Sequence, residues 1–351
     1  MPSGEIFAVD LFCGAGGLTR GLLDAGISVV AGYDSDPLCE FAYTSNNNCK
    51  FVLKDIQLLE GKELEQHFPG YGHRVLVGCA PCQPFSSYTQ GKRKIRRNDS
   101  RWGLLPEFSR LVRETSPDVV SIENVPHLQR SNLFKTFLEQ LKKLGYRGSY
   151  EVVDCRLYGV PQHRKRLVLL ASKHGPISLP KPDPNATCQS VREVIAHLDP
   201  LRDGETSTVD RLHKCMGLSP KNRQRIQQSR PGGSWREWDT SLVADCHKRD
   251  TGKKYGSVYG RMEWDQPAPT ITTQALFFGS GRFGHPEQDR PLSLREAALL
   301  QTFPPDYHFF QSGQARAMRD IARLIGNAVP VRLARVVADT IRAHLASIRK
   351  F

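Results

Sequence analysis

Short apolar runs alternate with helical stretches through the first half of the chain, and this alternation constrains the fold more than any other feature. The runs predicted to be buried strands are Ile6–Phe12, Ser28–Tyr33, Arg74–Ala80 and Asp118–Ile122. Helical stretches lie between them at Leu18–Ala25 and Leu104–Glu114. The alternation predicts an α/β fold with a doubly wound, parallel sheet, to which Tyr150–Asp154 and Leu167–Ala171 add two further strands.

The character of the sequence changes after Ser172. Four prolines between residues 176 and 184 break any regular element, and the chain stays polar and turn-rich to about Tyr307. The final segment is helical again, with apolar residues at helical spacing from Val329 to Leu345. We therefore predict a first domain of residues 1–175 and 318–351, onto which the final helix packs back. The second, smaller and irregular domain comprises residues 176–317, with a variable core at about 176–264.

Charge and cysteine content narrow the class of protein. The formal net charge is +13, which favours a polyanionic partner such as nucleic acid over a merely basic soluble protein. Nine scattered cysteines are typical of a reduced protein rather than of a disulfide scaffold. No apolar run reaches about 18 residues, and no secretory signal is visible, so we expect no membrane contact and a cytoplasmic location.

A glycine-rich segment, DLFCGAGGL at Asp10–Leu18, follows the first predicted strand and opens a helix. Gly14, Gly16 and Gly17 permit positive φ and let a ligand approach the backbone. Asp34 ends the next strand, where an acid can accept hydrogen bonds from ribose hydroxyls. The segment predicts nucleoside binding, and a tight turn without a ligand is the alternative. It fits neither the dinucleotide GxGxxG pattern nor a P-loop.

A cysteine between prolines, Cys82 in PCQP, lies just beyond the fourth predicted strand. Ligands of open α/β sheets bind outside the carboxyl ends of the strands, so Cys82 is placed as a nucleophile. The basic residues of the following loop can favour its thiolate and contact phosphates, and they are Lys92, Arg93, Lys94, Arg96 and Arg97. A metal pair with Cys79 would need a second pair of ligands, so we expect Cys79 to be core packing and no metal site.

Three further positions carry chemistry. Glu123 ends the fifth strand beside Cys82 and can donate a proton to a ring nitrogen, unless it is simply a solvated acid. Asp55 follows a third short strand and can accept a hydrogen bond from an adenine amino group. Arg164 and Arg166 alternate in an extended stretch, so they can point together at a phosphate or carbonyl, although a charged turn would look the same.

Together these motifs resemble the DNA (cytosine-5)-methyltransferase family over nearly the whole chain, in the family's motif order. The matching segments are DLFCGAGG, PCQPFS, ENV, QHRKR, RPLSLRE with LQTFP, and GNAVP. The resemblance implies a Rossmann-like methyltransferase sheet, a small target-recognition domain and S-adenosyl-L-methionine as cofactor. The residues implied to bind this cofactor are Phe12, Gly14, Gly16, Gly17, Leu18, Asp34, Asp55, Ile56, Pro81, Leu104, Asn327 and Ala328. The family often carries an aromatic residue after the acid, whereas this chain has Ser35, so adenine stacking must come from elsewhere, such as Ile56.

The resemblance also implies the reaction. Cys82 attacks C6 of a cytosine flipped out of double-stranded DNA, while Glu123 meets N3. Arg164 orients the base or the nucleophile, and Arg166 supports the site. The recognition region is expected to hold DNA through basic side chains, with Arg223, Arg225 and Arg236 among the candidates. Trp235, in the loop segment Gly232-Gly233-Ser234-Trp235, either points toward the DNA or belongs to the core.

Other functions fit the motifs less well. Transfer RNA methyltransferases of this family carry a Cys-Phe-Thr tripeptide, which is absent here. A catalytically silent DNA-binding relative would not need Cys82, Glu123 and Arg164, and a nicotinamide oxidoreductase leaves these residues unexplained. We expect a stand-alone monomer of the bacterial restriction-modification type, for which a cognate restriction endonuclease acting on the same DNA site is a further candidate partner.

Overall fold

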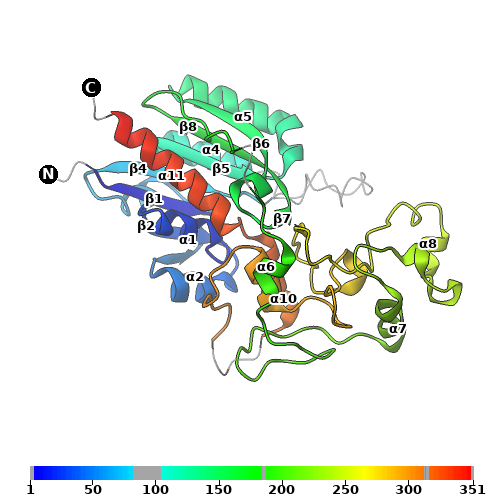
Figure 1. Ribbon diagram of the computed structural model, residues 1–351. Helices are drawn as coiled ribbons and strands as arrows, with labels where there is room; N and C mark the ends of the chain where they lie inside the picture. Colours follow the sequence, from blue (N-terminus) through cyan, green and yellow to red (C-terminus); the bar gives the residue numbers. More distant parts are fainter. Residues whose placement is uncertain (1–3, 82–103, 184–186, 312, 314–315, 349–351) are drawn as a thin grey trace. The chain divides into compact units, whose positions relative to one another are not determined.

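The computed structural model describes residues 4–81, 104–183, 187–311, 313 and 316–348, and these form two compact units (Figure 1). The first unit comprises Met1–Tyr158, Lys165–Pro184 and Val329–Phe351. The second comprises Gly159–Arg164 and Asn185–Ala328. This division differs from the predicted boundary at residue 318, because helix α10 (Met318–Asn327) packs on helix α9 (Leu294–Leu300) within the second unit.

A seven-stranded sheet forms the centre of the first unit. Its strands are β1 (Ile6–Leu11), β2 (Ser28–Asp34), β3 (Phe51–Leu53), β4 (His73–Gly78), β5 (Val119–Asn124), β6 (Arg147–Asp154) and β8 (Lys165–Ser172). The spatial order is β3-β2-β1-β4-β5-β8-β6, and the first five strands are parallel. Strand β8 is antiparallel to both neighbours. The predicted α/β class is confirmed, and β8 is the departure from a purely parallel sheet.

Helices cover the sheet of the first unit. They are α1 (Gly17–Asp24), α2 (Cys39–Asn47), α3 (Gly61–Glu65), α4 (Leu104–Thr115), α5 (Asn132–Lys143) and α11 (Val331–Ser347), with 3-10 turns η1 (Ile56–Leu58), η5 (Pro126–Arg130) and η6 (Cys155–Tyr158). Helix α11 lies along α1, as its apolar spacing predicts (Figure 1). The core includes Leu11, Leu76 and Phe108, all fully buried. Within the described residues, no helix has the length and apolar character needed to span a membrane.

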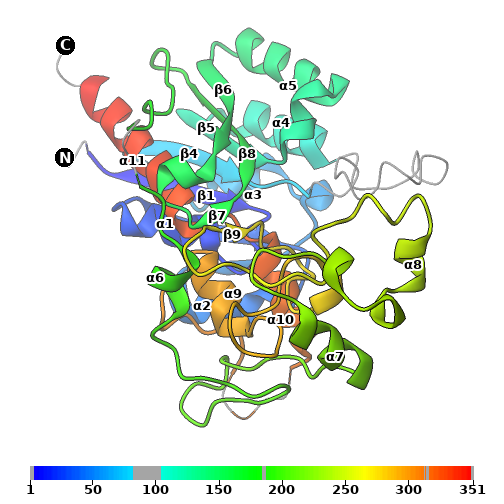
Figure 2. The ribbon, with the colours of Figure 1, turned by 45° about the vertical axis from the view of Figure 1, so that its right-hand side comes forward.

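The second unit is mostly turns and irregular chain, as the sequence predicts (Figure 2). Its regular elements are α6 (Val191–Ile195), α7 (Pro220–Gln228), α8 (Asp245–Lys248), α9 and α10, the short strands β7 (Gln162–His163) and β9 (Ala268–Pro269), and the 3-10 turns η7 (Trp235–Glu237), η8 (Thr240–Leu242) and η9 (Phe278–Ser280). A small core gathers Trp235, Trp238 and Phe278. Trp235 stacks on His247 with ring centroids 4.4 Å apart, so this tryptophan belongs to the core.

Buried arginines replace regular structure as the frame of the second unit. Arg290 and Glu296 are each 1 % exposed and form a paired contact, with nitrogen–oxygen distances of 2.8 and 2.7 Å. Arg261 donates hydrogen bonds to the carbonyls of Ile226, Ser229 and Gln288. Arg261 therefore binds several backbone carbonyls at once, and Arg290 satisfies a buried carboxylate.

Candidate active site

The carboxyl ends of β1, β4 and β5 meet at one edge of the sheet of the first unit. These strands are parallel, but their sequential order in the array β3-β2-β1-β4-β5 reverses between β1 and β4, and ligands of open α/β sheets bind at such a switch point. The glycine-rich segment follows β1, Pro81 follows β4, and Glu123 lies near the end of β5. The fold therefore brings the predicted motifs of the first unit to one edge.

The glycine-rich segment is a tight turn that closes against the end of β2. Phe12, Gly14 and Gly16 have φ values of 61°, 53° and 89°, in the left-handed region that glycine adopts most readily. The backbone N–H of Gly14 donates to Asp34 Oδ2 at 2.9 Å, and that of Asp36 donates to Asp34 Oδ1 at 2.9 Å. Asp34 therefore shapes the loop as well as offering a carboxylate at this edge.

A second acid, Asp10, lies beneath this loop and was not among the predicted site residues. Its side chain is fully buried, and Oδ2 accepts a hydrogen bond from the Thr19 hydroxyl at 2.7 Å. Among the described residues, nothing donates a hydrogen bond to Oδ1. Burial raises the pKa of Asp10 to about 7, and burial also raises the pKa of Asp34. Because Asp10 and Asp34 are both largely shielded from solvent, they suit a ligand that brings positive charge or hydroxyl donors.

The remaining residues predicted for the cofactor divide between the units. Leu18, Ile56 and Leu104 are buried in the first unit, and Pro81 is half-buried. Asp55 caps η1, because its Oδ1 accepts the backbone N–H of Gln57 at 2.9 Å. Gly17 is the first residue of α1. Asn327 is exposed and Ala328 is buried, and both belong to the second unit at the end of α10.

Glu123 is the centre of a polar cluster in the first unit. Its side chain is 8 % exposed, and Oε1 lies 2.8 Å from Nε of Arg166. The alignment is that of an ion pair rather than of a hydrogen bond. Strand register explains the contact, because Glu123 is opposite Val168 and alternate residues of a strand share a face, which puts Arg166 diagonally across.

Cys79 contacts the other oxygen of Glu123, which corrects the prediction that this cysteine is only core packing. The Cys79 thiol donates to Glu123 Oε2 with a sulfur–oxygen distance of 2.9 Å. Nearby, the Asn124 side-chain amide donates to the Ala80 carbonyl at 2.9 Å. Residues 79 and 80 are therefore held to the end of β5. The sequence could have indicated this contact, because Cys79 follows β4 and Glu123 lies near the end of β5, and β4 and β5 are neighbouring parallel strands.

Gly78 allows the end of β4 to lie this close to β1. A Cβ atom there would lie 2.7 Å from the Leu11 carbonyl oxygen and 3.0 Å from a ring carbon of Phe108. The predicted nucleophile Cys82 and the basic residues Lys92, Arg93, Lys94, Arg96 and Arg97 lie outside the described residues. The structure therefore describes the chain that leads to Cys82 as far as Pro81.

The two arginines of QHRKR bond to different groups. Arg164 is 2 % exposed and lies in the second unit, where it donates to the carbonyls of Ile271 at 2.9 Å and Ala328 at 3.4 Å. Arg166 lies in the first unit and pairs with Glu123. Arg166 is thus the described partner of Glu123, and the role predicted for Arg164 stays a prediction.

Of the three arginines predicted to contact DNA in the second unit, two are at its surface. Arg223 is half-exposed and pairs with Asp203, and Arg236 is exposed and lies over the Trp235 ring. Arg225 is 8 % exposed and donates to the Leu242 carbonyl at 2.8 Å. Its burial contradicts a direct role in DNA contact, because the guanidinium is used inside the unit.

Comparison with known families decides the class of this protein. The profile of the C-5 cytosine-specific DNA methylase family matches residues 6–343. The chain belongs to this family. The type II methylase M.HgiDII of Herpetosiphon aurantiacus is 49 % identical, over 97 % of this chain and 96 % of the relative. The type II methyltransferase M.PspPI of a Psychrobacter species is 31 % identical, over 97 % of this chain and 80 % of the relative.

Solved structures agree with the fold of this C-5 cytosine methylase. Spodoptera frugiperda DNMT2 matches with a TM-score of 0.67 at 16 % identity, over 96 % of this chain and 99 % of that one. The Entamoeba histolytica methyltransferase EhMeth matches with a TM-score of 0.66 at 15 % identity, over 97 % and 99 % of the two chains. The predicted Rossmann-like methyltransferase fold is confirmed.

Proposed function

We propose that this methylase transfers a methyl group from S-adenosyl-L-methionine to C5 of a cytosine in a specific double-stranded DNA sequence, as a type II modification enzyme. The observation that carries the proposal is the Cys79–Glu123–Arg166 cluster at the switch point of the sheet. Cys79 of this cluster lies three residues before Cys82 in the sequence. Family membership over residues 6–343 gives these residues their chemical context.

The residues around the glycine loop fit S-adenosyl-L-methionine as the group held there. Asp34 offers a carboxylate suited to ribose hydroxyls, and Asp10 offers a buried oxygen suited to a donor or a positive charge. Phe12, Gly14 and Leu18 would line the same pocket. Ile56 is 2 % exposed and packs in the core, so it would contribute little surface to the adenine. When bound, this cofactor supplies the methyl group.

The chain's own residues supply the activation of the cytosine. Cys82, as thiolate, forms a bond to C6 of a base flipped out of the duplex, and the displaced electron pair of the C5–C6 bond moves toward C5. Glu123 meets N3 and gives or shares a proton there, which lowers the cost of negative charge in the ring. Arg166 and Cys79 hold the two carboxyl oxygens in place. After C5 gains the methyl group, a base removes the C5 proton and the Cys82–C6 bond breaks.

Trapping with 5-fluorocytosine tests the proposal. A fluorine at C5 cannot leave as a proton does, so wild-type protein should form a covalent complex with modified duplex DNA only when the methyl donor is present. Cys82→Ala should form no complex and no methylated product while still binding the donor. Cys246→Ala removes an exposed cysteine of the second unit and is the matched control, which should trap normally.

Two results would contradict the proposal: methylation by Cys82→Ala, or no donor-dependent trapping by the wild-type protein. A transfer RNA substrate, tested in parallel, should remain unmethylated. Mapping methylated cytosines in DNA from cells that express the protein would then give the recognised sequence.

A further inference from the structure

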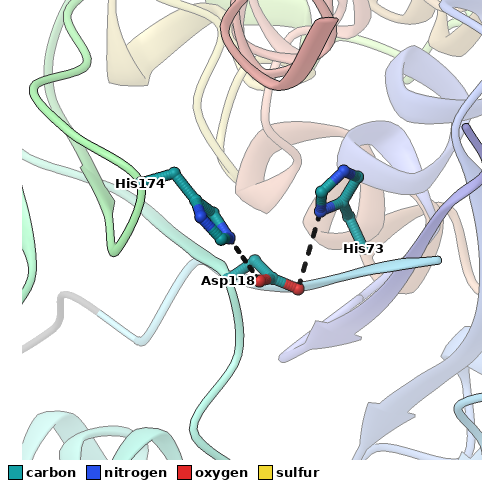
Figure 3. Close-up of side chains that lie close together, drawn as sticks. All are labelled: His73, Asp118 and His174. Carbon is teal, nitrogen blue, oxygen red and sulfur yellow. Dashed lines mark hydrogen bonds and ion pairs between the residues drawn. The ribbon is translucent and has the colours of Figure 1, made fainter. Parts of the chain in front are cut away.

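Two histidines and an aspartate meet at the edge of the first-unit sheet opposite the glycine loop and Glu123 (Figure 3). His73 begins β4, Asp118 directly precedes β5, and His174 lies just after β8. Because β8 is antiparallel to β5, its carboxyl end meets the amino ends of β4 and β5. The cluster therefore joins three neighbouring strands and is not part of the proposed methylation site.

The geometry of the three side chains suits a small divalent cation. His174 Nε2 lies 2.6 Å from Asp118 Oδ1, and His73 Nδ1 lies 3.9 Å from Asp118 Oδ2. One ligand atom from each residue lies within 4.8 Å of the other two. Zinc binds ligand atoms at about 2.0–2.2 Å, which puts those atoms roughly 3.3 Å from one another. Side-chain rotations that move the ligand atoms by about an ångström would therefore complete the site. Figure 3 shows the two imidazoles approaching the carboxylate from different sides.

Asp118 is already held as an ionised ligand. Its Oδ2 accepts the Arg74 backbone N–H at 2.8 Å. Burial by itself would raise the pKa of Asp118, but the hydrogen bonds from Arg74 and His174 outweigh burial and leave the pKa below its usual value. In the neutral imidazole of His174, Nε2 can bind a metal in place of sharing a proton with the carboxylate.

Solvent can reach the cluster, and neighbouring cations limit its affinity. The three side chains are 19 %, 23 % and 33 % exposed, which leaves room for a water as a fourth ligand. The Lys173 ammonium and Arg74 guanidinium both donate to the Ser116 carbonyl close by. Their charge opposes a dication, so we expect a dissociation constant of about a micromolar rather than the permanent occupation of structural zinc sites.

We propose that His73, Asp118 and His174 bind one first-row divalent metal ion, with zinc as the best fit to two imidazoles and one carboxylate. Bound metal ties the ends of β4, β5 and β8 together and stabilises the first unit.

Titration of the full-length, metal-free protein with Co²⁺ and with Zn²⁺ tests the site. The wild-type protein should bind one equivalent of Co²⁺, with a visible absorption band and without the near-ultraviolet band of a thiolate ligand. Zinc in large excess over its dissociation constant should raise the melting temperature by roughly 5 °C. His174→Ala should weaken binding by roughly 100-fold or more, since loss of a direct ligand costs more than the roughly 10–100-fold typical of an outer-shell partner, and His73→Ala should do the same.

His197→Ala is the matched control, since it removes an exposed histidine of the second unit and should leave binding unchanged. The variants' circular dichroism without metal shows whether they fold. The proposal is overturned if the wild-type protein binds no metal below about 100 µM, if cobalt binding is through thiolate, or if folded His73→Ala and His174→Ala both bind as the wild type does.

Discussion

The centre of the first unit is an apolar core beneath a regular sheet, whereas the second unit buries arginines among loops. All five buried arginines of the described chain belong to the second unit, namely Arg164, Arg225, Arg261, Arg290 and Arg295. In the first unit strand and helix hydrogen bonds satisfy the backbone. In the second unit backbone hydrogen bonds of turns are joined by guanidinium groups that bind buried carbonyls. Counting Lys and Arg in a sequence therefore overstates the charge that such a domain can present to DNA.

Breaking the buried pair of the second unit should have the largest effect. Arg290→Met leaves the Glu296 carboxylate buried without its partner, which costs about 3–5 kcal/mol. Tryptophan fluorescence during urea unfolding would report it, because Trp235, Trp238 and Trp264 lie in this unit. The double variant Arg290→Met/Glu296→Gln should recover part of the loss, because the amide oxygen keeps an acceptor for the Ser293 backbone N–H while the buried charge is removed. A single-variant cost below about 1 kcal/mol would mean that buried arginines do not frame this unit.

In the first unit the corresponding change should affect activity more than stability. Arg166→Ala removes the cation that holds Glu123, so kcat should fall roughly 10²–10³-fold with little change in binding of the methyl donor. Methylation kinetics on duplex DNA would measure this. Arg147→Ala, at an exposed position of β6, is the control and should retain its activity. A normal kcat in Arg166→Ala would remove the cluster from the mechanism.

Acid should destabilise the second unit before the apolar core of the first. Burial lowers the pKa of His285 to about 4, and in Glu296 the Arg290 hydrogen bond outweighs burial and lowers the pKa to about 2. Both groups bind more protons when unfolded, so their contribution is present near neutral pH and is lost as the pH falls from about 6.5 to about 2. Tryptophan fluorescence should therefore change at higher pH than far-ultraviolet circular dichroism. Coincident transitions would show that the two units unfold as one.

The smallest expected effect is on the salt dependence of DNA affinity, which should differ between exposed and buried arginines of the second unit. Arg236→Ala should lower the slope of log affinity against log salt by about 1, because it removes one surface charge. Arg225→Ala should leave that slope unchanged and lower stability instead, because its guanidinium bonds inside the unit. Filter binding or fluorescence anisotropy at several salt concentrations would compare them, and equal slopes in the two variants would erase the distinction.

Sequence patterns predicted the parts of this molecule that depend on local periodicity. Apolar runs located β1, β2, β4 and β5, and the motifs after those strands came together because parallel strands share a carboxyl edge. The position of β8 between β5 and β6 was not predictable, since spacing does not specify strand order. That position is what brings Arg166 to Glu123.

Other features depend on contacts that no local pattern encodes. The Cys79 thiol reaches Glu123 across 44 positions of sequence. Burial of Asp10 and Arg225 is likewise set by tertiary packing, and a charged residue in the sequence is more often exposed. The roles of Cys82 and of the basic residues after it stay predictions.

The packing of α11 on α1 has a consequence for how the protein is made. A Cβ atom at Gly21 of α1 would lie 2.4 Å from the Cβ of Ala334 in α11, so the two backbones touch closely. Residues 331–347 are translated long after the glycine loop has left the ribosome. The first unit must therefore wait through synthesis of the whole second unit before it can finish folding, and a nascent chain interrupted before α11 would expose the apolar face of α1 to chaperones and proteases.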